Sequence, residues 1–344
     1  MPLDSTADLR FALWEVELLR NARLTREISD NTVSLEVTFY EHGEWHDFNL
    51  ELEDRDGTFS QPDTFQIGDH LRFWVWFADR PDRSFMGEYT IDELHNEAMP
   101  SRVRVTGLAA DSVREDFRTL KTRGFEGMTL QGIAAQIARE HDLTPDLQGQ
   151  DIELLRREQK GEHDLQFLTR MAEQFGYVFR IEGQTLIYWQ RGIAEAQAPL
   201  SLQGLLTRRS FRYKTFKTYR RARVRYEDPQ KKQCIDVVVE DPSAKNDETL
   251  VITERVESHQ QAEMIATARL QGANIRRIEA EFDCLGVPEL KGGGNVTISG
   301  EGALFDGEYH VKEAAHKYDK SSGYTVRLKA YLKAGGAPAE AMAA

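Results

Sequence analysis

Apolar and polar residues alternate along several short segments of the first 110 residues. In Val33–Tyr40, the alternation places Val33, Leu35 and Val37 on one face, as in a strand that is buried on one side. Short strands separated by turn-forming residues are typical of an antiparallel barrel or sandwich. Further strands are predicted at Trp45–Leu52, Leu71–Phe77, Phe85–Tyr89 and Arg102–Leu108.

The pattern changes to helical spacing in the middle of the chain. Thr129 can cap a helix whose apolar residues recur every three or four positions, and this helix ends near His141. Asp164 can cap a second helix that stops at Gly176. A hairpin follows, with strands at Tyr177–Ile181 and Thr185–Trp189.

Strand-like patterns return after a linker at residues 192–199. Ser258 and Gln261 form a capping box that predicts one more helix. Strands are expected within Phe211–Tyr226 and at Ile235–Val239, Asn295–Ser299, Gly307–Glu313 and Tyr324–Leu332.

These patterns predict a mainly β protein with an α+β insertion. Two barrel-like domains would flank, or be completed around, the small α+β module. We expect the first barrel-like domain at residues 1–115, the module at 116–199, the second barrel-like domain at 200–334 and a flexible tail at 335–344.

Composition narrows the functional classes. The formal net charge of −13 favours solubility and argues against a protein whose main task is wrapping DNA. Cys234 and Cys284 do not form a C-x-x-C pair, so neither a disulfide framework nor a zinc site is expected, and a reducing compartment is the default. No signal peptide is evident, and Leu71–Ala78, the most apolar run, is too short to span a bilayer.

No catalytic, cofactor-binding or metal-binding residue is predicted. His42, Glu44 and His46 form the tightest ligand-like cluster, but Gly43 and the flanking strands favour a hairpin turn over a metal site. Residues 292–295 read Gly-Gly-Gly-Asn and lack the Gly-Lys-Ser/Thr ending of a phosphate loop. His310 and His316 have no third ligand nearby in the sequence.

One segment is basic in an otherwise acidic chain. Arg208–Arg225 holds nine basic residues and no acidic one, with aromatic residues between them. Three interpretations remain open: a solvated face of an amphipathic strand, a contact with an acidic partner, or a nucleic-acid surface. The candidate partner-contact residues are Arg212, Lys214, Arg221, Arg223 and Arg225. If they meet acidic groups of a neighbour, replacing Arg221, Arg223 and Arg225 by glutamine should weaken assembly without unfolding the monomer.

Several short motifs, in order along the chain, resemble those of the phage late control D family. The resemblance runs from about Leu50 to Leu332 and includes Phe65–Asp69 with Phe85–Gly87, and the helix from Thr129 to Leu143. His141-Asp142 replaces the small residues more usual there. Further matching positions are Asp164, Phe167, Leu168, Ala172 and Gly176 in the second helix, and Lys291–Gly300, Phe305–Val311, His316 and Gly323–Thr325 near the C-terminus.

The resemblance implies a structural baseplate hub of a contractile phage tail, related to the hub half of type VI secretion spike proteins. It implies two tube domains, a homotrimer, and contacts with a spike protein and with tail tube or tube-initiator proteins, without catalytic residues. We expect assembly in the bacterial cytoplasm, no membrane contact in the resting particle, no cofactor, and DNA at most as passing cargo. A tail-associated cell-wall hydrolase and a nucleic-acid-binding module that uses residues 208–225 are the alternatives.

Overall fold

The computed structural model describes residues 11–109, 117, 119–214, 218–228, 233–242, 244 and 246–333. The N-terminal part is built from antiparallel strands and one short helix, α1 (Thr25–Asn31). All five strands expected there are present, and the segment around Phe85 lies inside a much longer strand. They are β2 (Thr32–Tyr40), β3 (Asp47–Glu53), β4 (His70–Phe77), β5 (Arg80–Ala98) and β6 (Ser101–Ala109). A sixth strand, β1 (Ala12–Leu18), was not predicted.

The C-terminal strands extend the same sheet. Strand β2 pairs antiparallel with β19, so that Val37 lies opposite His316, and the two β-rich blocks form one sheet of 12 strands with a shared core. Its main order is β1-β4-β5-β6-β3-β2-β19-β20-β17-β13. The C-terminal strands are β12 (Leu200–Ser201), β13 (Leu206–Tyr213), β17 (Ile278–Leu285), β18 (Asn295–Ile298), β19 (Gly307–Asp319) and β20 (Gly323–Leu332).

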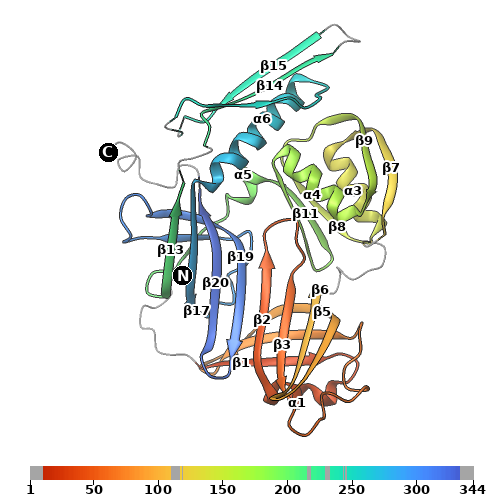
Figure 1. The fold of residues 1–344 in the computed structure, drawn as a ribbon, viewed down its shortest axis with the longest axis vertical. Helices are drawn as coiled ribbons and strands as arrows, with labels where there is room; N and C mark the ends of the chain where they lie inside the picture. Colours follow the sequence, from red (N-terminus) through yellow and green to blue (C-terminus); the bar gives the residue numbers. More distant parts are fainter. Residues whose placement is uncertain are drawn as a thin grey trace.

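The α+β module lies between these blocks in the chain and packs above the sheet (Figure 1). As predicted, Thr129 caps a helix: its hydroxyl accepts a hydrogen bond from the Gly132 amide at 3.0 Å. Gly176 ends the second helix with φ near 75°, a conformation that favours glycine. The elements are β7 (Lys121–Thr129), α3 (Leu130–Glu140), β8 (Thr144–Gln148), β9 (Glu153–Glu162), α4 (Asp164–Phe175), β10 (Tyr177–Glu182), β11 (Thr185–Gln190) and α5 (Arg191–Ala194).

The role assigned to Asp164 was wrong. His163 is the N-cap of α4, and Asp164 is the first helical residue, with its carboxylate buried among cationic side chains. A cap carboxylate would accept backbone amides, whereas this one accepts from the side chains of Lys121 and Arg123. The sequence pattern could not show these partners, because they lie more than 40 residues away.

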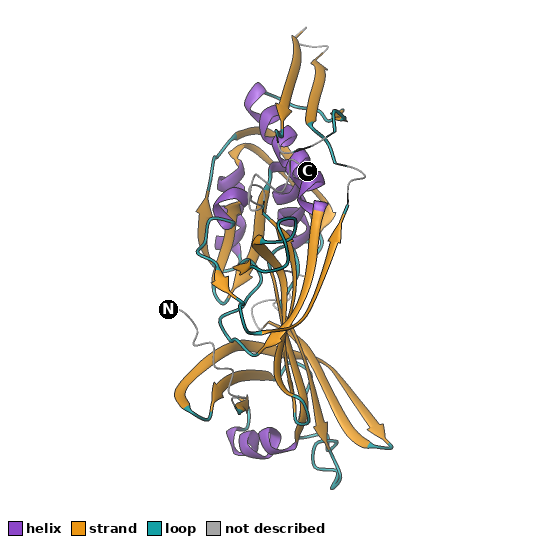
Figure 2. Ribbon diagram, turned by 90° about the vertical axis from the view of Figure 1, so that its left-hand side faces the viewer, coloured by secondary structure: helices purple, strands orange, loops and turns teal. Residues whose placement is uncertain are grey.

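A second hydrophobic core joins the module to part of the C-terminal region. Helix α6 (His259–Asn274) packs against a three-stranded sheet and against α4, and their buried apolar residues form one cluster with those of α3. The hairpin of β14 and β15 extends away from the helices (Figure 2). This sheet has the order β15-β14-β16, formed by β14 (Arg221–Asp228), β15 (Gln233–Glu240) and β16 (Thr249–Ile252).

The predicted fold class is confirmed: the chain is mainly β with an α+β insertion. Within the described residues, β1 and β13 are the ends of the main strand order and do not pair with each other. The division into domains at residues 115, 199 and 334 stays a prediction, and the packing of α6 on the module was not part of it. The tail at 335–344 lies outside the described residues.

Candidate functional site

The basic segment is divided between two sheets. Arg212 belongs to β13, at the end of the large sheet, whereas Arg221, Arg223 and Arg225 belong to β14, the central strand of the small sheet. The sequence pattern suggested similar amphipathic strands in both places, and it could not show that the chain crosses from one sheet to the other between them.

The three arginines on β14 have carboxylate partners within the chain. Arg221 contacts Glu240 at 2.9 Å and Asp247 at 2.6 Å. The Nε atom of Arg223 donates to Asp236 at 2.8 Å, and Arg225 pairs with Glu227 at 2.9 Å. All three side chains remain between about a third and half exposed. The repulsion expected along this face is therefore relieved within the chain, and a contact with a partner protein stays a prediction.

The other two candidate residues lie on or just after β13. The ammonium group of Lys214 contacts Glu279 at 2.5 Å, and Arg212 lies directly opposite the same glutamate in the strand register. Arg212 has no carboxylate within ion-pair distance among the described residues. A contact of Arg212 with a partner protein stays a prediction.

The turn at His42–His46 connects the large sheet to the module through a hydrogen bond. The Nδ1 atom of His42 accepts a hydrogen bond from the Phe179 amide at 2.9 Å, and that of His46 accepts from the Tyr40 amide at 3.1 Å. Burial lowers the pKa of both rings, for His46 to about 4. No group of three potential metal ligands occurs in the part of the chain that the structure describes.

His310 and His316 are fully buried and hydrogen-bonded. Nε2 of His316 donates to the Leu290 carbonyl at 2.6 Å, so its Nδ1 accepts from the Tyr324 hydroxyl at 2.7 Å. Burial lowers the pKa of this ring to about 4. His310 lies between the carboxylate of Glu41 and the side-chain oxygen of Asn295. These contacts give both histidines a structural role.

The glycine run allows a close approach between two parts of the backbone. A Cβ atom at Gly292 would lie 2.5 Å from the carbonyl carbon of Tyr40 in β2, and Gly293 has φ near 87°. The glycines therefore allow close packing where the loop meets the sheet.

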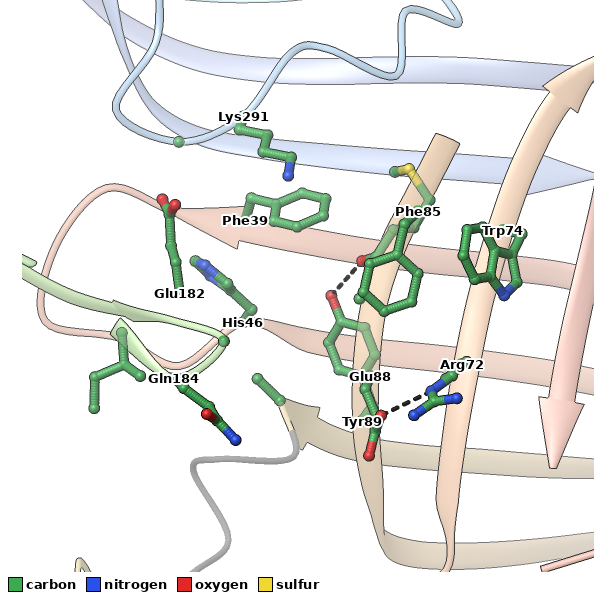
Figure 3. Close-up of a pocket in the computed structure, with 16 residues that line it drawn as sticks. Phe39, His46, Arg72, Trp74, Phe85, Glu88, Tyr89, Glu182, Gln184 and Lys291 are labelled. Carbon is green, nitrogen blue, oxygen red and sulfur yellow. Dashed lines mark hydrogen bonds and ion pairs between the residues drawn. The ribbon is translucent and has the colours of Figure 1, made fainter. Parts of the chain in front are cut away.

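A cleft of about 620 Å³ lies between the N-terminal strands, the turn of β10 and β11, and this glycine loop. In Figure 3, His46 and Glu182 lie at one end of the cleft, while Phe85 and Trp74 lie at the other. The ammonium group of Lys291 lies 5.1 Å from the centroid of the Phe39 ring. The cleft could receive a side chain or a short peptide segment, but it shows no nucleophile paired with a base among its described lining residues.

A buried charge cluster in the module was missed by the sequence analysis. The carboxylate of Asp164 is fully buried and accepts from Lys121 at 2.5 Å, Arg123 at 2.8 Å and Gln159 at 2.7 Å, and it contacts His141 at 2.8 Å. Although burial alone would raise the pKa of Asp164, these hydrogen bonds and positive charges hold it well below its usual value. The cluster ties β7 and β9 to the start of α4.

None of the described helices is both long and apolar enough to cross a lipid bilayer.

Comparisons with known proteins place this arrangement in a family. The chain is 24% identical to the probable baseplate hub protein of Escherichia phage 186 over 178 residues, and 27% identical to that of Escherichia phage P2 over 179 residues. Each match covers 51% of this chain and 44% of the relative, so the aligned region spans less than half the length of those relatives.

Solved structures share the fold over nearly the whole chain. The 43 kDa tail protein of prophage MuSo2 from Shewanella oneidensis has a TM-score of 0.69 at 15% identity, covering 93% of this chain and 98% of that one. An Escherichia coli component of the type VI secretion system has a TM-score of 0.57 at 12% identity, covering 90% and 76%. The model of the phage tail baseplate hub (GPD) family matches residues 108–322, more than half of the sequence, and the chain therefore belongs to the phage tail baseplate hub family.

Proposed function

We propose that this protein is a structural hub that joins a sixfold tail tube to a threefold spike, as a homotrimer. The observation that carries the proposal is the sheet that connects two β-rich blocks through β2 and β19. Three chains with two such blocks each would present six similar surfaces to the tube and three to the spike. Closed cyclic symmetry is the usual way to satisfy such contacts without forming fibres.

The proposal includes partners of three kinds: two further copies of the chain, a spike protein, and a tube or tube-initiator protein. The relatives support this choice, because they are baseplate hub, tail and type VI secretion proteins. The proposal also holds that the protein has no enzymatic activity and assembles in the host bacterial cytoplasm. DNA would pass the hub only as cargo.

Native mass spectrometry of the chain co-expressed with its spike protein tests the adaptor role. We expect a complex with three hub chains per spike trimer. A hub that stays monomeric beside the spike, or that forms a stable dimer, would contradict the proposal. Release of muropeptides from purified peptidoglycan by the hub alone would instead support the hydrolase alternative.

A further inference from the structure

Strand β13 is the open end of the large sheet. It is the last strand of the main order and pairs only with β17 among the described strands (Figure 1). Most of its residues are exposed, with Phe211 half-buried against Phe282 and Phe305. An exposed strand edge is a template on which another chain can add a strand.

The hydrogen-bond alternation shows which groups of β13 face the open side. The Lys214 amide donates to the Arg277 carbonyl at 2.8 Å, so Lys214 and every second residue before it face β17. The N–H and C=O groups of the intervening residues therefore point away from the sheet. These are the residues Arg209, Phe211 and Tyr213, and no described residue forms a hydrogen bond with their backbone groups on that side.

The opposite end of the sheet is closed. Helix α1 lies along β1, and the hydroxyl of Ser29 accepts a hydrogen bond from the Val16 amide at 3.0 Å. Covering an edge in this way is how proteins prevent unwanted strand addition. Among the described residues, α1 covers part of β1 and no element covers β13, and this contrast favours β13 as the edge that receives a partner.

The charge of β13 restricts that partner. The strand contains three arginines and no acidic residue, in a chain with net charge −13. Arg209 pairs with Glu301 at 2.9 Å within the chain. Arg208 is 71% exposed and its contact with Asp283 is long, at 3.9 Å. Arg212 has no ion-pair partner among the described residues. Two copies of β13 side by side would bring arginines together, which disfavours a twofold contact. An acidic segment on a different surface of another copy fits the charge.

We infer that β13 receives an extended acidic segment of the next copy as an added strand, and that this contact closes the hub ring head to tail. The inference rests on the proposed homotrimer and names the strand through which it forms. It follows that β13 contacts a different element of its neighbour rather than another β13, because head-to-tail contacts generate closed rings whereas a self-contact generates a dimer.

Replacing Arg209 by proline tests the inference at the backbone. The N–H of Arg209 faces the open side, so Arg209→Pro removes no hydrogen bond of the chain's own sheet, but it removes a donor and adds a ring at the edge. The substitution also removes the half-exposed ion pair of Arg209 with Glu301, which contributes little to stability. We expect a melting temperature within a few degrees of wild type and a shift of the trimer–monomer midpoint, measured by light scattering, to at least about tenfold higher concentration. In the wild-type trimer, hydrogen exchange at the amides of Arg209 and Phe211 should be slowed relative to monomer.

Three further variants separate the possible causes. Ser210→Pro, one residue along, breaks the ladder with β17 and should lower the melting temperature, which confirms the alternation. Arg212→Glu reverses the charge without touching the backbone and should also weaken the trimer. Arg26→Glu, a 93% exposed arginine on α1, should leave the trimer unchanged.

The outcomes distinguish the two proposals. A wild-type trimer that persists unchanged in both Arg209→Pro and Arg212→Glu overturns the inference and leaves the hub proposal standing. A wild-type chain that stays monomeric, with its spike protein present, overturns both. A wild-type dimer that the two substitutions dissociate would show a self-contact of β13 and contradict the head-to-tail contact.

Discussion

Replacing Asp164 by asparagine should destabilise the module severely. The substitution keeps the size of the side chain but removes the fully buried negative charge that contacts Lys121, Arg123 and His141. Glu140 stays beside Lys121 and Arg123, at 3.6 and 2.6 Å, and keeps them partly paired. Removing one partner of a buried ion pair typically costs about 3–5 kcal/mol, because the opposite charges are left unpaired. Lys121 and Arg123 are a quarter exposed and can turn partly toward water. We therefore expect a loss at the lower end, about 3 kcal/mol.

Glu140 supplies the matched control. It also pairs with Arg123, at 2.6 Å, but its side chain is 30% exposed. Glu140→Gln should cost less than about 1 kcal/mol, as is usual for surface ion pairs. Urea denaturation followed by circular dichroism measures both free energies of unfolding. A loss of less than about 1 kcal/mol in Asp164→Asn, equal to that of Glu140→Gln, would refute the reasoning.

The pH dependence of the same variant gives a second test. The pKa of Asp164 is held below its value in the unfolded chain, which is about 3.9. Its stabilising contribution is therefore complete above that value and is lost as the pH falls below it. The difference in unfolding free energy between wild type and Asp164→Asn should be constant from pH 7 to 5 and shrink toward pH 3. A difference that grows on acidification would show the opposite linkage.

Three other predictions concern single features. Gly176→Ala should cost about 1 kcal/mol, because it forces alanine into a left-handed conformation. Gly272 lies in the last turn of α6, where an added Cβ atom would meet no atom within 4 Å, so Gly272→Ala should stabilise by at most about 0.5–1 kcal/mol; thermal unfolding compares the two variants. Because the pKa of His316 is lowered to about 4, the unfolded chain takes up a proton at a higher pH than the folded chain. The free energy of unfolding should therefore fall as the pH drops from about 6.5 to 4. NMR titration of the His316 ring should show a midpoint near 4 rather than 6.5. Replacing Arg221, Arg223 and Arg225 together by glutamine should leave the melting temperature within a few degrees of wild type, because surface ion pairs contribute little to stability. Sedimentation assays should show that this variant loses affinity for any acidic partner.

The sequence was sufficient for the elements with a strong period. The strand at Val33–Tyr40 and the capped helix after Thr129 were both predicted and are confirmed. Because one face of each element is buried, its apolar residues recur with a period of two in a strand and 3.6 in a helix. The pair β7 and β9 was missed. Both strands are mostly exposed and polar, so neither carries the alternation that marks a half-buried strand.

Long-range pairing lay beyond the sequence pattern. The joining of β2 to β19 brings together residues nearly 280 positions apart, and the attachment of α6 to the module depends on contacts with α4 that no local signal encodes. Of the candidate basic residues, Arg212, Arg223 and Arg225 are exposed strand residues, whereas Arg221 is half-buried and Lys214 follows the end of β13. Their carboxylate partners could be found only once the neighbouring strand was known, as for Arg223 and Asp236. The openness of β13 likewise depends on the strand order.

Cryo-electron microscopy of the assembled particle tests the central claim most directly. The map should show three copies of this chain forming a closed ring between the last ring of the tail tube and the spike, with both β-rich blocks of each copy lining the ring. Six copies in the ring, a position at the periphery of the baseplate, or absence of the chain from the particle would contradict the account.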